Sequence, residues 1–339
     1  MSLMFDELLA PPLPRRLQVE VTAACNLRCR MCLVRYRPTQ PRSASMSFAA
    51  FKRLIDGLPG LEEVVLQGVG EPLLAPGLFA MLQYARERGI AAGFNCNATL
   101  LTRRRAERLL DAGLSWICFS LDGATPQTYE FVRDGARWDT ATRNIAGFMR
   151  QVRERGGPRP DVSLVMVLMR RNLHEIAGVV TRAAEWGIPR VFAQSLSHDF
   201  SDAPGAAYAA IARYVNEQSV AGLPRAEVEA AYAEARAAAE RLGVELRLPQ
   251  LEERPEPIAI AGVPVGCSWP FESGYVAYDG VVQPCCMVMG SDRARLGSVA
   301  ERPFAEVWES DHFRDFRAGL LNGQPPAVCR GCALYHGRF

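Results

Sequence analysis

The stretch Cys25-Asn26-Leu27-Arg28-Cys29-Arg30-Met31-Cys32 holds three cysteines spaced C-x3-C-x2-C. It follows directly on an alternating apolar run, Leu17, Val19 and Val21, which predicts a β-strand. A structural zinc site normally takes four ligands and favours paired C-x2-C knuckles. Three thiolates on one loop instead suit a cubane iron–sulfur cluster that keeps one iron free for a ligand from outside the protein.

The composition is that of an ordinary globular protein whose cysteines are clustered. Of 339 residues 49% are hydrophobic and 22% are charged, and the net charge of +2 gives no reason to expect nucleic acid or an anionic membrane as a partner. Three of the ten cysteines lie near the N-terminus, and five lie near the C-terminus: Cys267, Cys285, Cys286, Cys329 and Cys332. In a chain of this length such clusters indicate metal binding rather than a disulfide framework.

The sequence gives no sign of export or membrane insertion. Residues 1–16, an N-terminal extension, lack the basic start and apolar core of a signal peptide. No apolar run approaches the roughly 20 residues of a membrane span. We therefore expect a cytoplasmic protein.

From residue 17 to 197 the pattern alternates between strands and helices. The periodicity predicts strands at Leu17–Val21, Glu63–Gln67, Ala91–Asn95, Trp116–Leu121, Val162–Met169 and Arg190–Gln194. It predicts helices between them at Phe48–Gly57, Gly77–Arg88, Arg103–Ala112, Asp139–Arg155 and Leu173–Trp186. Six such units predict an α/β fold with a parallel sheet and external helices, two units short of a full eightfold barrel.

The cysteine loop resembles that of the radical S-adenosylmethionine (radical SAM) family, in which SAM chelates the fourth iron of a [4Fe–4S] cluster. The family usually has an aromatic residue before the third cysteine, where this chain has Met31. The resemblance implies that Cys25, Cys29 and Cys32 hold the cluster and that residues 17–197 form a partial (β/α)6 barrel, similar to part of a TIM barrel. Chemistry in such barrels takes place at the C-terminal ends of the strands, where this loop lies.

Other strand ends also resemble family motifs. Gly68-Val69-Gly70-Glu71-Pro72 resembles the glycine-glycine-glutamate motif that holds the amino group of SAM, because glycines allow close approach of the backbone and a carboxylate suits an ammonium group. A glycine turn with a solvated acid is the alternative. Asn95–Leu101 resembles the "TNG-x-LL" turn with Ala98 in place of glycine, and Ser120–Gly123 resembles the "S-x-D-G" motif.

The resemblance implies a set of SAM-binding residues at these strand ends: Gly68, Gly70, Glu71, Pro72, Asn97, Ser120, Asp122 and Arg170. Arg170 belongs to the sequence Arg170-Arg171-Asn172, for which a solvated surface is the alternative. Cys96 and Cys118 have no partner at ligand spacing, so we expect them to be core thiols.

Residues 198–261 have a different pattern. Ala206–Val215 and Arg225–Arg241 predict amphipathic helices, and Gly243–Leu248 predicts a strand. The prolines that follow, among them Pro249 and Pro257, indicate a linker. We expect a helical insert and linker over this range, between the barrel and a C-terminal module of residues 262–339.

That module carries the second group of cysteines. Tyr275–Tyr278 and Val281–Gln283 flank Asp279-Gly280, which predicts a hairpin that brings Cys267 close to Cys285. The segments Phe304–Trp308 and Phe313–Ala318 predict helices that return the chain to Cys329-Arg330-Gly331-Cys332.

The module resembles the small α+β "twitch" form of the SPASM extension of radical SAM enzymes, which binds an auxiliary [4Fe–4S] cluster. The ligands implied are Cys267, Cys285, Cys329 and Cys332. Side chains of adjacent strand residues point to opposite faces, so only one of Cys285 and Cys286 should reach the cluster. From its position after the glycine-valine-valine-x-proline lead-in we expect this ligand to be Cys285, with Cys286 as packing. A zinc ribbon with the same four cysteines is the alternative.

The resemblance implies an enzyme that cleaves SAM reductively to a 5′-deoxyadenosyl radical and takes a hydrogen atom from its substrate, with an electron donor such as flavodoxin or ferredoxin. Four cysteines would saturate the auxiliary cluster, which favours electron relay during an oxidation. The resemblance to the family's twitch-bearing dehydrogenases of aminocyclitols implies a small-molecule substrate (a sugar, an aminocyclitol or a sugar-nucleoside) that undergoes dehydrogenation or decarboxylation in natural-product biosynthesis. Gln194, Ser195, His198 and Arg170 are candidate substrate contacts.

Three other classes of function stay open. Radical SAM enzymes that modify ribosomal peptides often carry a leader-binding domain or more cysteines, and neither is evident in this sequence. A non-catalytic metal-binding protein would not need the motifs at Gly68–Pro72 and Ser120–Gly123. A methyltransferase or activating enzyme of the same family is the third, and the auxiliary cysteines argue against its simplest forms.

Overall fold

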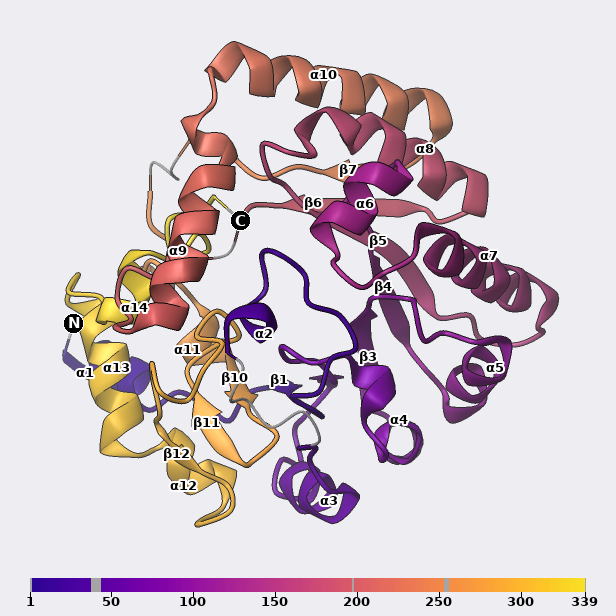
Figure 1. The fold of residues 1–339 in the computed structure, drawn as a ribbon. Helices are drawn as coiled ribbons and strands as arrows, with labels where there is room; N and C mark the ends of the chain where they lie inside the picture. The colour runs from indigo at the N-terminus through magenta and orange to yellow at the C-terminus, as the bar shows by residue number, and fades with distance from the viewer. Residues whose placement is uncertain (1, 38–43, 197, 253–255, 339) are drawn as a thin grey trace.

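One continuous sheet runs through the protein. The computed structural model describes residues 2–37, 44–196, 198–252 and 256–338. Within these residues the main sheet has the strand order β12-β11-β10-β1-β2-β3-β4-β5-β6-β7. The sheet curves around the centre of the molecule, with helices α3, α4, α5, α7 and α8 on its outer side (Figure 1).

The parallel part of the sheet confirms the predicted α/β partial barrel. Every neighbouring pair from β1 to β7 is parallel. These strands are β1 (Arg16–Val19), β2 (Glu63–Val65), β3 (Ala91–Cys96), β4 (Trp116–Ser120), β5 (Asp161–Val167), β6 (Arg190–Gln194) and β7 (Glu245–Arg247). The first six correspond to the six predicted strands, with ends that differ by no more than two residues.

The helices that cover the barrel begin and end at recognisable caps. They are α3 (Phe48–Asp56), α4 (Leu78–Glu87), α5 (Arg103–Ala112), α6 (Pro126–Val132), α7 (Trp138–Glu154) and α8 (Ile176–Trp186). The Thr102 hydroxyl accepts a hydrogen bond from the Arg105 N–H at the start of α5. Gly113 and Gly187 end α5 and α8 with φ of 86° and 73°, a left-handed conformation that favours glycine.

The packed core lies between the sheet and these helices. Phe94 on β3 and Phe119 on β4 are fully buried, and the Phe119 ring meets the edge of Phe148 on α7 at 5.5 Å between centroids. Three short helices, α1 (Ser2–Leu9), α2 (Leu33–Tyr36) and α6, were not predicted, because so few turns leave little periodicity to detect.

The segment expected to be a helical insert extends the barrel sheet. Helices α9 (Ala206–Gln218) and α10 (Arg225–Leu242) form as predicted. The strand that follows, β7, pairs with β6 and covers an edge that would otherwise be unpaired. Helix α10 packs along α8 (Figure 1). Residue 197, the predicted end of the barrel, lies outside the described residues.

The C-terminal module joins the same sheet at its other side. The predicted hairpin is present: β10 (Ser273–Val276) pairs antiparallel with β11 (Val281–Gln283), which pairs with β12 (Gly297–Ser298). Strand β10 also pairs in parallel with β1, with Gln18 opposite Tyr275. The sheet therefore places the module directly beside the mouth of the barrel.

The remaining elements of the C-terminal part are small. They comprise β8 (Ala259–Ile260), β9 (Val263–Pro264), α11 (Trp269–Glu272), α12 (Phe304–Trp308), α13 (Asp311–Leu321) and α14 (Ala327–Arg330). The buried Arg317 guanidinium on α13 donates to the Leu9 and Trp308 carbonyls, both at 2.9 Å, and so ties the two ends of the chain together. Among the described helices, none is both long and apolar enough to cross a membrane.

Candidate active site

The cysteine loop leaves β1 at the C-terminal edge of the barrel and is held by the end of α6. The backbone N–H of Arg28 donates to the Asp134 carbonyl, and that of Arg30 to the Val132 carbonyl, both at 2.9 Å. Leu27 is buried beneath the loop. These contacts turn Cys25, Cys29 and Cys32 toward one cavity, which all three line.

That cavity, here called the cluster cavity, has a volume of about 420 Å³ and lies at the strand ends. Each of the first six barrel strands, or the loop that follows it, contributes at least one lining residue, among them Gln18, Gln67, Asn95, Ser120, Val167 and Gln194. The C-terminal module closes the other side with Trp269, Tyr275, Cys286, Met287, Met289 and Leu334. The cavity is therefore shared between the barrel and the module.

The glycines of the predicted SAM motif permit a close approach to the end of β1. A Cβ atom on Gly70 would lie 2.2 Å from the Thr22 carbonyl oxygen, and one on Gly68 would lie 2.2 Å from the side chain of Glu20. Both glycines line the cluster cavity, as does Glu71. Pro72 begins the short 3-10 helix η1 (Pro72–Leu74), and it does not line the cavity.

Glu71 and Asn97 are joined at the cavity wall. The Glu71 carboxylate accepts hydrogen bonds from the backbone N–H groups of Asn97 at 2.9 Å and Leu73 at 3.2 Å, while burial raises its pKa. The Asn97 side chain donates to Asn26 in the cysteine loop at 3.0 Å. Ala98 takes φ of 61°, so it adopts the left-handed turn for which the related motif uses glycine.

Asp122 lies behind the cavity wall and does not line it. Its carboxylate accepts from the Val167 N–H at 2.8 Å and forms a buried ion pair of 2.7 Å with Arg133. Arg133 does line the cavity, and its positive charge opposes the rise that burial causes in the pKa of Cys29. The prediction that Asp122 contacts SAM is not supported, and Arg133, which sequence reasoning missed, is the cation beside the cysteines.

Arg170 does not reach the cluster cavity. Its backbone N–H donates to the Gln218 carbonyl at 2.8 Å and its Nε to the Ser219 carbonyl at 3.1 Å, so it holds the loop after β5 against the end of α9. The expected SAM contact is therefore not supported. Of the four candidate substrate contacts, Gln194 lines the cluster cavity, whereas Ser195 and His198 line a separate cavity.

His198 is a buried residue of the auxiliary site. Its Nδ1 accepts from the Phe200 N–H at 2.8 Å, so Nε2 carries the proton and donates to the Val328 carbonyl at 2.6 Å. Its backbone also forms an isolated bridge with Cys332. His198 thus clamps the C-terminal C-x2-C loop, and it is buried and does not line the cluster cavity, so the expected substrate contact is not supported.

The auxiliary cysteines gather where the sequence predicts. Burial raises the pKa of the Cys285 thiol, and the nearby Cys286, Cys332, Cys267 and Cys329 raise it further. Cys286 also lies near Cys332 and Cys267, but it packs with Tyr275, Ala277 and Val281 and lines the cluster cavity. This arrangement is in keeping with Cys285 as the ligand, a choice that stays a prediction.

The residues at both sites fit iron–sulfur clusters. Three thiols share one wall of the cluster cavity, which also presents Glu71, Asn97 and Ser120 to a polar ligand. Burial raises the pKa of Cys25 and Cys29 to about 12, and a bound metal deprotonates a coordinating thiol outright. No three His, Cys, Asp or Glu side chains in the described part of the chain converge closely enough to hold a single metal ion.

Comparison with known proteins identifies the family. A sequence model of the radical SAM superfamily matches residues 19–183, and a model of the SPASM iron–sulfur cluster-binding domain matches residues 267–333. This chain belongs to the radical SAM superfamily and carries a SPASM domain. The cofactors of such an enzyme are a SAM-binding [4Fe–4S] cluster, an auxiliary [4Fe–4S] cluster and SAM. The SPASM match favours a cluster over zinc at the auxiliary cysteines.

Three related proteins have established names. The tungsten-containing aldehyde ferredoxin oxidoreductase cofactor-modifying protein of Pyrococcus furiosus is 24% identical over 94% of this chain and 87% of its own length. The Fe-coproporphyrin III synthase of Methanosarcina barkeri is 28% identical over 90% of this chain and 76% of its own. The mycofactocin maturase MftC of Mycobacterium tuberculosis is 28% identical over 50% and 41%.

The fold is also found in a solved crystal structure. The crystal structure of Streptococcus suis SuiB bound to the precursor peptide SuiA superposes with a TM-score of 0.71 and covers 99% of this chain and 73% of that chain. The sequence identity is 15%, so this similarity concerns the fold alone.

Proposed function

We propose that this radical SAM enzyme takes a hydrogen atom from a residue of a ribosomally made peptide. The observation that carries the proposal is a second cavity of about 410 Å³, which shares Val69, Tyr275 and Met289 with the cluster cavity. Each volume lies within the roughly 300–1,000 Å³ typical of ligand sites. Cluster and SAM would fill the cluster cavity, so the second cavity gives room for a substrate larger than one sugar ring.

The comparisons favour the peptide alternative over the small molecule expected from sequence. The SuiB structure that matches 99% of this chain was solved with a precursor peptide. MftC, a maturase, is related over half of the chain. A peptide segment crossing from the second cavity into the cluster cavity would pass between the barrel and the SPASM domain.

The residues around the cluster cavity suit this chemistry. The bound cluster and SAM supply a radical that removes hydrogen from an unactivated C–H bond. Gln18, Asn95 and Ser120 offer hydrogen bonds at the strand ends, while Met31, Trp269 and Leu334 form an apolar side that excludes water. Holding one C–H bond in place while water is excluded is the task of the protein in such a reaction.

A tetrapyrrole substrate is the second candidate, because the Methanosarcina barkeri relative over 90% of this chain is an Fe-coproporphyrin III synthase. The charges of the second cavity argue against it. Among the described residues, Glu20, Asp279 and Asp292 line that cavity together with a single arginine, Arg37. Such a wall repels the several carboxylates of a coproporphyrin.

The test is substrate-dependent formation of 5′-deoxyadenosine by the anaerobically reconstituted enzyme with a strong reductant. Short peptides encoded beside its gene, Fe-coproporphyrin III and a panel of aminocyclitols are compared, with mass spectrometry of each. We expect stimulation and a mass change for a peptide only. Turnover of an aminocyclitol would restore the small-molecule hypothesis, and conversion of Fe-coproporphyrin III would establish the second candidate.

A further inference from the structure

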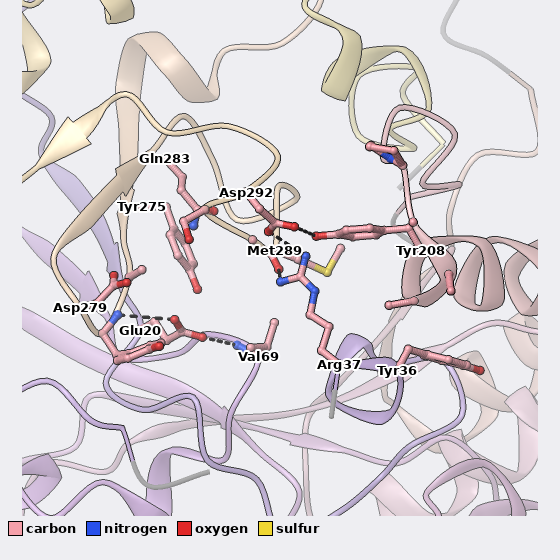
Figure 2. Close-up of a pocket in the computed structure, with 18 residues that line it drawn as sticks. Glu20, Tyr36, Arg37, Val69, Tyr208, Tyr275, Asp279, Gln283, Met289 and Asp292 are labelled. Atoms are coloured by element: carbon pink, nitrogen blue, oxygen red, sulfur yellow. Dashed lines mark hydrogen bonds and ion pairs between the residues drawn. The ribbon is translucent and has the colours of Figure 1, made fainter. Parts of the chain in front are cut away.

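The second cavity lies between the mouth of the barrel and the hairpin of the SPASM domain (Figure 2). The end of β1 and the glycine loop contribute Glu20 and Val69, and the hairpin contributes Tyr275, Asp279 and Gln283. The start of α9 and the loop 289–292 form the opposite wall. Because it shares three lining residues with the cluster cavity but lies outside it, we assign a group bound here to the substrate rather than to SAM.

One end of this cavity is rich in hydrogen-bond acceptors. Glu20 is only 4% exposed, and its carboxylate accepts from the Val69 N–H at 3.0 Å, from the Tyr278 N–H at 3.5 Å and from the Tyr275 hydroxyl. Gln283 is 2% exposed, and its Oε1 has no hydrogen-bond donor. A buried amide oxygen without a donor is costly, so it marks a place where a ligand N–H is expected.

The cation at the other end is already engaged. Arg37 pairs with Asp292 at 3.0 Å and donates to the Met289 carbonyl at 3.2 Å, while the Tyr208 hydroxyl donates to Asp292 at 2.8 Å. Figure 2 shows this group across the cavity from Glu20. Among the described residues that line the cavity, Arg37 is the sole cation, and it pairs with Asp292 rather than with Glu20 or Asp279.

Aromatic rings add to this preference for positive charge. Tyr275 and Tyr278 both hydrogen-bond to Glu20, and Tyr36 and Tyr208 lie on the opposite side (Figure 2). Ring faces attract ammonium and guanidinium groups, by about 0.5–2 kcal/mol each depending on solvent exposure. Carboxylates, a free amide oxygen and tyrosine rings together match a cationic nitrogen group.

We propose that the second cavity binds a cationic nitrogen group of the substrate, with Glu20 as its carboxylate partner and Gln283 Oε1 as a further acceptor. Resting on the proposed peptide substrate, we place that group on a basic side chain of the peptide, for which lysine serves as the probe. This anchor would set which neighbouring peptide residue enters the cluster cavity. Glu20 is thus a specificity-determining residue.

The charge state of Glu20 makes this preference depend on pH. Burial raises the pKa of Glu20 from 4.5 to about 7, and Asp279 raises it further, while hydrogen bonds from Val69, Tyr278 and Tyr275 lower it. Arg37 is the cation that faces it, and Tyr275 and Tyr278 stay protonated at neutral pH. A bound ammonium favours the carboxylate, so affinity should rise by about tenfold between pH 6 and pH 8.

The experiment measures binding to the anaerobically reconstituted holoenzyme with SAM by calorimetry. The probes are acetyl-Ala-Ala-Lys-Ala-Ala-amide and the same peptide with norleucine, which has a similar shape and no charge. We expect at least tenfold tighter binding of the lysine peptide, with affinity increasing from pH 6 to pH 8. Equal affinity for the two peptides would overturn the proposal.

Variants assign the effect to the cavity. Glu20→Gln keeps an acceptor oxygen and should remove the lysine preference and its pH dependence, whereas Glu240→Gln, on the exposed face of α10, should retain both. Iron content and circular dichroism show whether each variant is folded. A lysine preference that persists in Glu20→Gln would refute the assignment. Peptide turnover without a lysine preference would refute this inference alone and leave the proposed function standing.

Discussion

Arg133 and Asp122 form an ion pair of 2.7 Å that is buried behind the three cysteines of the cluster loop. Asp122 follows β4 and Arg133 ends α6, the helix whose last residues hold the cysteine loop through the Val132 and Asp134 carbonyls. The pair therefore fixes α6, and with it the loop, against the strand ends.

Replacement of Arg133 by glutamine should be strongly destabilising. Removing one partner of a buried pair leaves the other charge uncompensated and costs about 3–5 kcal/mol. Thermal unfolding of the anaerobic protein measures this loss. Arg104→Gln, on the exposed face of α5, is the control and should change stability by no more than about 0.5 kcal/mol. Full stability of Arg133→Gln would mean that the pair does not support the loop.

Gly70→Ala should disrupt the SAM side of the cluster cavity. The added Cβ would lie 2.2 Å from the Thr22 carbonyl oxygen and 2.6 Å from that of Ala24, and backbone atoms cannot move aside as the end of a side chain can. Overpacking of this kind costs about 1–3 kcal/mol. We expect weaker SAM binding by equilibrium dialysis and a lower Tm. Gly60→Ala, whose Cβ meets nothing within 4 Å, should match wild type.

The two adjacent cysteines of the SPASM hairpin should respond differently to substitution. Cys285 lies among the other auxiliary cysteines, whereas Cys286 packs with Tyr275 and Val281. Reconstituted wild type should hold about eight irons, four for each [4Fe–4S] cluster. Cys285→Ala and the double variant Cys329→Ala/Cys332→Ala should hold about four, and Cys286→Ala about eight. The reverse result for Cys285 and Cys286 would exchange their roles.

His198→Ala should loosen the auxiliary site without touching a cysteine. Loss of the ring leaves the Val328 carbonyl and the Phe200 N–H without their partners, at about 1–3 kcal/mol for each buried group. We expect iron content to fall toward four irons per chain after gel filtration. The matched control is His312→Ala on the exposed face of α13, which should keep full iron content.

Much of the site could be predicted because its chemistry is local in sequence. The spacing of Cys25, Cys29 and Cys32, the glycines before Glu71 and the alternation that gives six strands each lie within a short stretch. Parallel strands then bring their ends to one edge, whatever the details of the helices. This is why Ser120 and Asn97 line the cavity as predicted.

The features that sequence reasoning missed depend on contacts between distant segments. Arg133 and Glu20 carry no motif, and their roles arise only from what packs on them, such as the Tyr278 N–H some 258 residues along the chain from Glu20. Arg170 follows a strand as a site residue would, yet α9 draws its side chain away. One signal for further site residues was available in the sequence, namely the alternation of the strands. Because alternate strand residues share a face, it could have indicated that Gln18 and Asn95 face inward.

Glu20→Gln should stabilise the protein at alkaline pH even as it removes substrate selectivity. The folded pKa of Glu20, about 7, lies above its ordinary value of 4.5, so the folded state binds the proton more tightly than the unfolded state. The stabilisation of the folded state by protonated Glu20 is therefore fully present below pH 4.5 and is lost as the pH rises through 7. The stability lost over this range is about 3 kcal/mol. Glutamine does not ionise, so chemical denaturation should find a stability gap between variant and wild type that opens from pH 5 to pH 8. A gap independent of pH would show that Glu20 does not titrate in this range.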